Sequence, residues 1–323
     1  MDDIFIGSVL ASTLRVSIPL ILCSLAGLFS ERSGVVDIGL EGKILVGAFT
    51  TATIGILSGS LIVAVFAALM VTVFFSWIHG FACVSYGGDQ IVSGVAINII
   101  AAGLTAVLAT AIFSQGGQTP PVPDSIRLST LFPSLVENYK DIPWFGPIII
   151  SGLLGHNIMI YMAITFVPLA WWILWRTSFG LRLRAVGENP KMVDAAGISV
   201  QKMRYSALTI NGILCGLSGC YLILAQNPSF IQNMSAGRGF ISLAAMIFGK
   251  WHPVGAFGAC LLFGLLDALA IRMQGVDIPG IGEIPVQLVQ GAPYVLTVIL
   301  LAGLIGKAIP PKSVGIPYTK ERT

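Results

Sequence analysis

Two short charged motifs stand at the start of apolar runs that contain several glycine or alanine residues. The motifs are Glu41-Gly42 and Arg238-Gly239. A helix that begins at either motif would present free backbone amides, which suit a polar solute. Their side chains carry opposite charge and could pair with each other across a pathway. The competing interpretation is that each motif only caps and packs a helix end.

Neutral polar and aromatic side chains form a second group of candidates. Asn98 lies inside the apolar run 92–113, and Phe240 directly follows the second charged motif. An amide can bond a polar solute without a full charge, and an aromatic ring can stack on a flat one. Similar amides occur at Asn211, Gln226 and Asn227. Because the same residue types also join membrane helices to one another, helix packing is the competing interpretation.

The sequence lacks the residue patterns of catalysis and metal binding. The three histidines are scattered, and the five cysteines lie in apolar stretches without a Cys-x-x-Cys pair. A Walker A loop needs Ser or Thr after Gly-Lys, but the Gly-Lys pairs of this chain are followed by Ile44, Trp251 and Ala308. The chain is therefore predicted not to be an enzyme, to hold no metal or cofactor, and not to hydrolyse ATP itself.

The composition places these residues in a membrane. Of 323 residues, 55% are hydrophobic and 10% are charged, which is too little charge to cover a soluble protein of this length. A net charge of +3 without a basic stripe gives no sign of nucleic-acid binding. The apolar runs are continuous rather than alternating, so they predict helices. The expected fold is all-α, a single polytopic transmembrane bundle over residues 1–323 with about 8–10 spans and broken or re-entrant helices.

The predicted spans also give an orientation. They cover residues 5–29, 44–66, 62–82, 92–113, 146–175, 205–226, 240–249, 253–271 and 287–306. The second and third spans run together, and a break is expected only near Ser58-Gly59-Ser60. The run 240–249 is too short to cross a bilayer alone, so it must begin upstream or be a broken helix. Lys and Arg are concentrated in residues 176–204 and in the C-terminal tail, and both are therefore expected in the cytoplasm. The proline-rich residues 114–145 are then expected to form an external loop.

The basic segment 176–204 contains a short helix with marked ends. Asn189 can cap it, Pro190 suits its first position, and Gly197 suits its end. Asp194 falls one turn after Pro190. Because a helix of about two turns is unstable by itself, we expect it to dock against a partner. The competing interpretation is an ordinary basic loop between two spans.

Several motifs together resemble the permease subunits of ABC importers that serve branched-chain amino acids, simple sugars and nucleosides. The motifs are Ser33–Gly42, Asp89–Gly94 with Asn98, Gly180–Pro190 with Ala195–Ile198, and Gly237–Ile241 with Ala244–Gly249. The tail sequence Gly315-Ile316-Pro317-Tyr318 is similar to the nucleoside branch in particular. The resemblance extends over residues 5–320.

The resemblance implies a subunit that forms the translocation pathway for a nucleoside in the inner membrane of a bacterium or archaeon. Its expected partners are a separate ABC ATPase, a second permease (the same chain or a related one), an extracytoplasmic solute-binding protein and the lipid bilayer. The implied pathway residues are Glu41, Gly42, Asn98, Arg238, Gly239 and Phe240. The implied ATPase-coupling residues are Arg184, Glu188, Asn189, Pro190, Asp194 and Gly197.

Three alternatives stay open at this point. A permease for simple sugars such as ribose or galactose would carry the same motifs. A secondary transporter driven by an ion gradient would use an acid at membrane depth, such as Asp267 or Glu41, but it would not need the capped basic helix. A membrane-embedded enzyme would require a cluster of catalytic groups, which the sequence does not show.

Overall fold

The computed structural model describes residues 2–139, 142, 145–273, 277–278, 282–283, 291, 295 and 308–319. Within them the chain is helical apart from one short antiparallel pair, β1 (Asp277–Ile278) and β2 (Gly282–Glu283). Seven of the described helices are long and apolar enough to cross a membrane. The chain is therefore a multi-pass membrane protein of the all-α class, as the sequence predicts. The expected span 287–306 lies almost entirely outside the described residues.

The helices fall into long and short ones. The long helices are α1 (Asp2–Arg32), α2 (Leu40–Ser58), α3 (Leu61–Gly80), α4 (Gln90–Phe113), α6 (Ile158–Arg176), α9 (Val200–Tyr221) and α11 (Pro253–Met273). The short helices are α5 (Pro133–Tyr139), α7 (Ser178–Glu188), α8 (Pro190–Ala195) and α10 (Arg238–Phe248). Wider π-helical turns occur at Phe81–Ser85, Phe145–Leu154 and Leu222–Gln226. The first and last of these turns extend α3 and α9, respectively.

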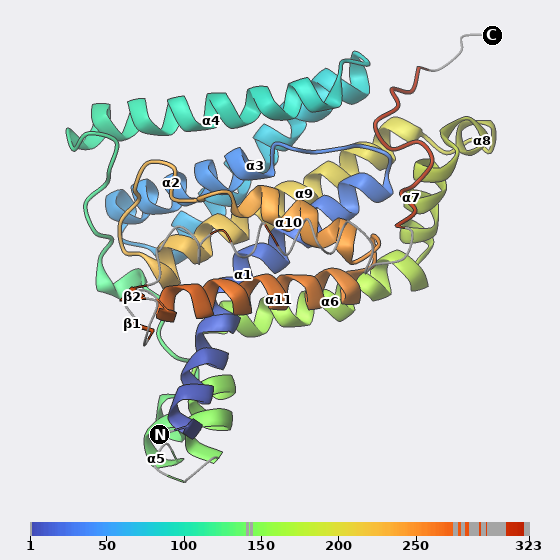
Figure 1. The fold of residues 1–323 in the computed structure, drawn as a ribbon. Coiled ribbons are helices and arrows are strands. Elements are labelled where there is room, and N and C mark those ends of the chain that lie inside the picture. The colour runs from blue at the N-terminus through green and yellow to red at the C-terminus, as the bar shows by residue number, and fades with distance from the viewer. Residues whose placement is uncertain are drawn as a thin grey trace.

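Helix α9 lies in the middle of the bundle, whereas α4 runs along one face of it (Figure 1). In the most apolar stretch of α9 and its π-helical extension, 83% of the residues are buried, whereas the corresponding share in α4 is 22%. The main apolar core joins side chains of α1, α2, α9 and α10, among them Leu25, Leu45, Cys215 and Met246. All five cysteines are free and buried. Helix α4 therefore has an apolar face that the described part of the chain does not cover.

Two predicted span boundaries have different outcomes. The expected break between the second and third spans is confirmed, because α2 ends at Gly59 with a left-handed φ of 63°. The span expected over 146–175 is present as α6, but its expected start at residue 146 is wrong. The chain breaks at residues 155–157, between the π-helical turn and α6, and the side chain of Asn157 caps α6 by accepting a hydrogen bond from the Ile160 amide (3.3 Å).

The region expected as an external loop, residues 114–145, has structure of its own. It contains the 3-10 turn Asp124–Ile126 and helix α5. Its backbone follows the chain after α9, because the amides of Thr119 and Val122 donate to the carbonyls of Phe230 (3.1 Å) and Pro228 (2.8 Å). These bonds hold the region against the segment that leads into α10. The side of the membrane on which it lies stays a prediction.

Candidate functional site

The chain between α1 and α2 turns back into the bundle. At the end of α1, the Arg32 guanidinium donates to the Trp251 carbonyl (3.0 and 2.7 Å), and the Trp251 indole donates to Glu31 (2.6 Å). Trp251 lies just after the end of α10, whereas Glu41 meets the start of α10. Because the 11 residues of α10 rise by about 16 Å, the segment after Arg32 runs roughly that far inward (Figure 1). We call residues 33–39 the re-entrant segment.

The carboxylate of Glu41 holds the start of α10. Its two oxygens accept hydrogen bonds from the amides of Gly237 (2.8 Å) and Gly239 (2.6 Å). The N-terminus of a helix has free amides and a partial positive charge, so a carboxylate is favourable there. A Cβ atom on Gly239 would lie 2.5 Å from the Glu41 nitrogen, which shows why glycine stands at this position. Helices α2 and α10 thus begin at the same depth in the bundle, and their first residues contact each other.

Arg238 does not bind Glu41 directly. Its guanidinium donates to the Met234 carbonyl (3.2 Å), and no ion pair between Arg238 and Glu41 exists among the described residues. The structure therefore does not show the direct pairing that the sequence suggested, because backbone amides occupy both oxygens of Glu41. Arg238 still interacts electrostatically with Asp267 and Glu41. The neighbouring Phe240 is 49% exposed.

Asn98 of α4 joins the end of the re-entrant segment to the start of α2. Its side-chain oxygen accepts from the Gly42 amide (2.8 Å), and its side-chain nitrogen donates to the Ile38 carbonyl (3.0 Å). A Cβ atom on Gly42 would lie 2.9 Å from the Asn98 Cα, so glycine permits the close approach of α2 and α4. This geometry supports the helix-joining interpretation of Asn98, and a contact with a solute stays a prediction.

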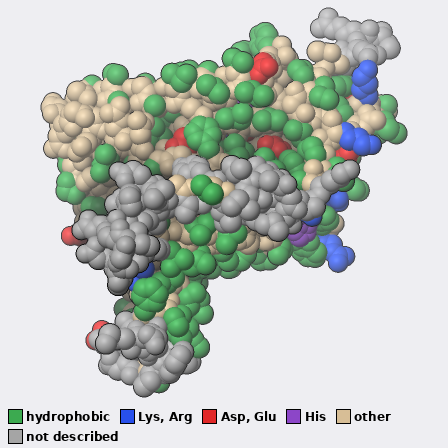
Figure 2. Space-filling model, in the orientation of Figure 1, with side chains coloured by type: hydrophobic (Ala, Val, Ile, Leu, Met, Phe, Trp, Pro, Cys, Tyr) green, Lys and Arg blue, Asp and Glu red, His purple; other side chains and the backbone are tan. Residues whose placement is uncertain are grey.

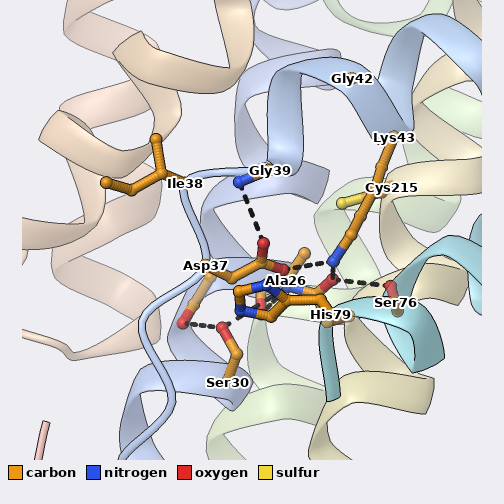
Figure 3. Close-up of polar contacts among 12 residues, drawn as sticks. Ala26, Ser30, Asp37, Ile38, Gly39, Gly42, Lys43, Ser76, His79 and Cys215 are labelled. Atoms are coloured by element: carbon orange, nitrogen blue, oxygen red, sulfur yellow. Dashed lines mark hydrogen bonds and ion pairs between the residues drawn. The ribbon is translucent and has the colours of Figure 1, made fainter. Parts of the chain in front are cut away.

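A fully buried ion pair anchors the re-entrant segment (Figure 3). Lys43 Nζ donates to Asp37 Oδ2 (2.5 Å) and to Asn211 Oδ1 (3.0 Å). The second oxygen of Asp37 accepts from the Gly39 amide (3.0 Å), and the Asn211 nitrogen donates to the Ala26 carbonyl of α1 (3.1 Å). Buried charges are tolerated when they are paired and hydrogen-bonded. This network therefore ties the re-entrant segment and α2 to α9 and α1.

Side chains from other helices satisfy the remaining backbone of the re-entrant segment. The Val36 amide donates to Gln90 Oε1 (2.6 Å), and the His79 Nε2 atom lies 2.9 Å from the Val36 carbonyl. His79 Nδ1 in turn contacts the Ser93 hydroxyl (3.0 Å). Irregular backbone at membrane depth requires such partners because no water is available there.

Most of this network was not predicted from the sequence. The sequence predicts no function for Asp37, Lys43, His79 or Gln90, and Asn211 is only one of several amides in apolar runs. The available signal was Lys43 itself, because an ionisable residue inside an apolar run indicates a buried partner.

At one end of the bundle lie α7, α8 and the turn after α8, which together cover residues 178–197 (Figure 1). We call them the coupling segment after the role that the sequence predicts for them. The predicted short helix is confirmed. Asn189 accepts from the Met192 amide (3.2 Å), Pro190 is the first residue of α8, and Gly197 has a φ of 79°. Helix α7 was not predicted, although Thr177 caps it by accepting from the Gly180 amide (3.1 Å).

The coupling residues predicted from the sequence lie in different surroundings. Arg184 faces α6, where it donates to the Leu174 carbonyl (3.0 Å) and its guanidinium lies 5.3 Å from the Trp175 ring centre. Glu188 is exposed, and Asp194 lines a cavity of about 280 Å³ together with Tyr318 of the tail. Most Lys and Arg side chains visible in Figure 2 gather at this end.

Helix α8 is buried on one side only. Val193 is 7% exposed and packs with Val186 and Val200, whereas Met192 is 70% exposed. The outer side of α8 thus offers an exposed apolar residue directly after the exposed Lys191. This surface lies apart from Glu41 and the start of α10, since the re-entrant segment runs between them.

A polytopic bundle with two helices that start inside it is an architecture of membrane transport proteins. The chain belongs to the family described as branched-chain amino acid transport system/permease component, whose model matches residues 9–305. As a family member it is an ABC transporter permease.

Two curated relatives match nearly the whole chain. The guanosine ABC transporter permease protein NupQ of Bacillus subtilis is 41% identical, with 99% of each chain covered. The nucleoside ABC transporter permease protein NupC of Lactococcus lactis is 38% identical, with 97% of each chain covered. A solved structure described as an inward-facing conformation of a metal-chelate type ABC transporter has a TM-score of 0.50 at 14% identity, covering 91% of this chain and 84% of its own. That likeness shows the fold alone.

Proposed function

We propose that this chain is the membrane-spanning subunit of an ATP-driven importer and forms the pathway for a nucleoside. The substrate class rests on the two relatives named for guanosine and nucleoside transport, which match this chain almost from end to end. The single structural observation that carries the pathway is the junction of α2 and α10, where Glu41 holds two helix starts together inside the bundle.

The pathway passes along this junction. Gly42, Gly239 and Asn98 shape its wall through close backbone approach, Arg238 contributes charge, and Phe240 offers an exposed ring. A nucleoside carries hydroxyl groups and a flat base, so hydrogen bonds and stacking suit it better than a full counter-charge. Glu41 holds the start of α10 at this wall, and Arg238 is the first residue of that helix. Glu41→Gln and Arg238→Ala should for that reason reduce uptake while the complex still assembles. Normal uptake by both variants would exclude this route.

The coupling segment is the dock for a separate ABC ATPase in the cytoplasm. Its support is the one-sided burial of α8, with Met192 exposed, and the basic charge around it. Each chain has one such dock, so a complete transporter contains a second permease, either this chain or a related one. A solute-binding protein delivers the nucleoside on the opposite side of the inner membrane, where residues 114–145 lie.

The test begins with the tagged chain purified from its native membrane in mild detergent, with its partners identified by mass spectrometry. The recovered complex is reconstituted in proteoliposomes, and uptake of guanosine, adenosine, ribose and galactose is compared with and without ATP. We expect an ATPase and a binding protein to co-purify, and we expect ATP-dependent nucleoside uptake that excess ribose does not inhibit.

Two results would contradict the proposal. ATP-dependent uptake of ribose or galactose without nucleoside uptake would identify a sugar permease. Repeated recovery of the chain alone, with uptake abolished by an ionophore, would identify a carrier driven by an ion gradient.

A further inference from the structure

The C-terminal tail, described over residues 308–319, crosses the end of the bundle that carries α7 and α8 (Figure 1). Most of the tail is exposed, but Pro311 is buried and Ser313 is only 6% exposed. A buried serine in an exposed tail needs hydrogen-bond partners. Those partners show what the tail holds in place.

Ser313 donates hydrogen bonds to backbone carbonyls in the last turn of α7. Its amide donates to the Gly187 carbonyl (2.9 Å), and its hydroxyl lies 2.6 Å from the same oxygen and 3.1 Å from the Val186 carbonyl. In a continuous helix, the Val186 carbonyl would accept from the amide of residue 190. That residue is Pro190, which has no N–H. Ser313 therefore supplies the hydrogen-bond donor that Pro190, the first residue of α8, lacks.

The tail also contacts the start of the re-entrant segment. The Gly315 amide donates to the Gly34 carbonyl (3.3 Å). Gly34 has a φ of 87°, and a Cβ atom there would lie 2.8 Å from the Ser313 hydroxyl. A Cβ atom on Gly187 would lie 2.3 Å from the Arg32 carbonyl oxygen. The end of α7, the tail and the chain after α1 thus meet with no room for a methyl group.

This joint lies between the two functional regions. On one side, Gly187 is followed by Glu188 and helix α8. On the other side, Gly34 leads into Asp37 with its buried ion pair, and then to Glu41 at the start of α10. Only a few residues separate Gly187 from α8 and Gly34 from Asp37. Because the backbone between them is closely packed, a displacement of one region would be transmitted to the other rather than absorbed by a flexible linker.

We propose that the tail is a mechanical link in which Ser313 holds the coupling segment against the re-entrant segment. Movement that the ATPase imposes on α8 passes through Gly187 and Ser313 to Gly34, and from there to Glu41 and α10. This inference rests on the proposed function, because it requires an ATPase that moves α8. Ser313 is a positioning residue and does not contact the solute.

The test uses Ser313→Ala, which removes the hydroxyl and keeps the tail backbone. Ser206→Ala is the matched control, because the hydroxyl of this half-buried residue donates only within its own helix, to the Lys202 carbonyl (2.8 Å). Both variants are reconstituted as complete transporters, and solute uptake is measured per ATP hydrolysed. We expect Ser313→Ala to lower this ratio by about three- to tenfold, as the loss of a hydrogen bond would allow. Assembly and basal ATP hydrolysis should match those of Ser206→Ala.

A second measurement reports on α10 directly. In a Phe240→Cys background, the rate of thiol labelling should change when ATP is added, and Ser313→Ala should suppress this change while Ser206→Ala retains it. An unchanged uptake ratio, an unchanged labelling response or a loss of assembly in Ser313→Ala would each overturn the link. Absence of ATP-dependent uptake in the unmodified transporter would instead overturn the proposed function.

Discussion

The re-entrant segment and the coupling segment both depart from regular membrane helices, yet they satisfy their backbone groups in different ways. The re-entrant segment depends on side chains from distant helices, such as Gln90, His79 and Asn98. In the coupling segment, α8 is capped by Asn189, which directly precedes it. The first segment is mostly buried, and its one charged side chain, Asp37, is fully buried in the ion pair with Lys43 of α2, whereas half of the second segment's residues are exposed.

This difference suits the two segments to the different mechanical roles that we propose for them. A backbone held from three or four helices can change position only if those helices move with it, which suits the wall of a pathway. A locally capped helix can move as a unit without losing its own hydrogen bonds, which suits a dock. The backbone at the end of α7 nevertheless depends on a remote side chain, because Ser313 of the tail donates to its carbonyls.

The largest expected effect comes from breaking the buried ion pair. Lys43→Met leaves the Asp37 carboxylate buried without its cation, and we expect a loss of about 3–5 kcal/mol in the free energy of unfolding. The melting temperature of the purified protein in detergent measures it. The double variant Asp37→Asn/Lys43→Met should recover much of the loss, because no charge is then left unpaired. A single variant as stable as the unmodified protein would show that the pair does not anchor the segment.

A smaller loss is expected at the start of α10. Glu41→Gln keeps the shape of the side chain but removes the charge and replaces one acceptor by a donor that faces a backbone amide. We expect a cost of about 2–3 kcal/mol, together with reduced uptake. Glu188→Gln is the matched control, since Glu188 is exposed at the end of α7. Equal melting temperatures for the two variants would mean that Glu41 does not support α10.

The junction of the re-entrant segment with α4 should be less sensitive. Asn98→Ala removes one donor and one acceptor, and a cost of about 1–2 kcal/mol follows if water cannot replace them. Hydrogen exchange of the Gly42 amide, followed by mass spectrometry, should become faster in this variant. An unchanged exchange rate would show that the hydrogen bond to Asn98 does not protect the Gly42 amide.

The smallest expected effect lies in the coupling segment. Asn189→Ala removes the cap of α8 and should cost that helix about 1 kcal/mol, with little change in melting temperature but weaker binding of the ATPase. Asn157→Ala removes an equivalent cap at α6, away from the dock, and should leave ATPase binding intact. Co-purification of the ATPase with each variant compares the two. Recovery of equal amounts of ATPase with the two variants would show that α8 is not needed for ATPase docking.

The same contrast explains what the sequence could predict. Helix α8 was predictable because Asn189, Pro190 and Gly197 mark its ends within a few residues. Glu41 and Arg238 were recognisable as helix starts, but the sequence could not show that glycine amides would occupy both oxygens of Glu41.

Other features depended on contacts between distant parts of the chain. The pairing of Lys43 with Asp37 and Asn211 depends on how α2 and α9 pack, and no local pattern encodes that. Helix α7 was missed because a short amphipathic helix with several arginines has the composition of a basic loop.

The burial of all five cysteines has a practical consequence for chemical labelling. A water-soluble maleimide has no accessible thiol to modify in the folded protomer, so native cysteines contribute little background. Single cysteines introduced at exposed positions beside the proposed dock and pathway, such as Leu181 or Ile231, can therefore carry fluorophores or spin labels in the otherwise unmodified chain. Distances between such probes would report movement of these two regions through the transport cycle without first replacing Cys23 or Cys215, which pack within the core.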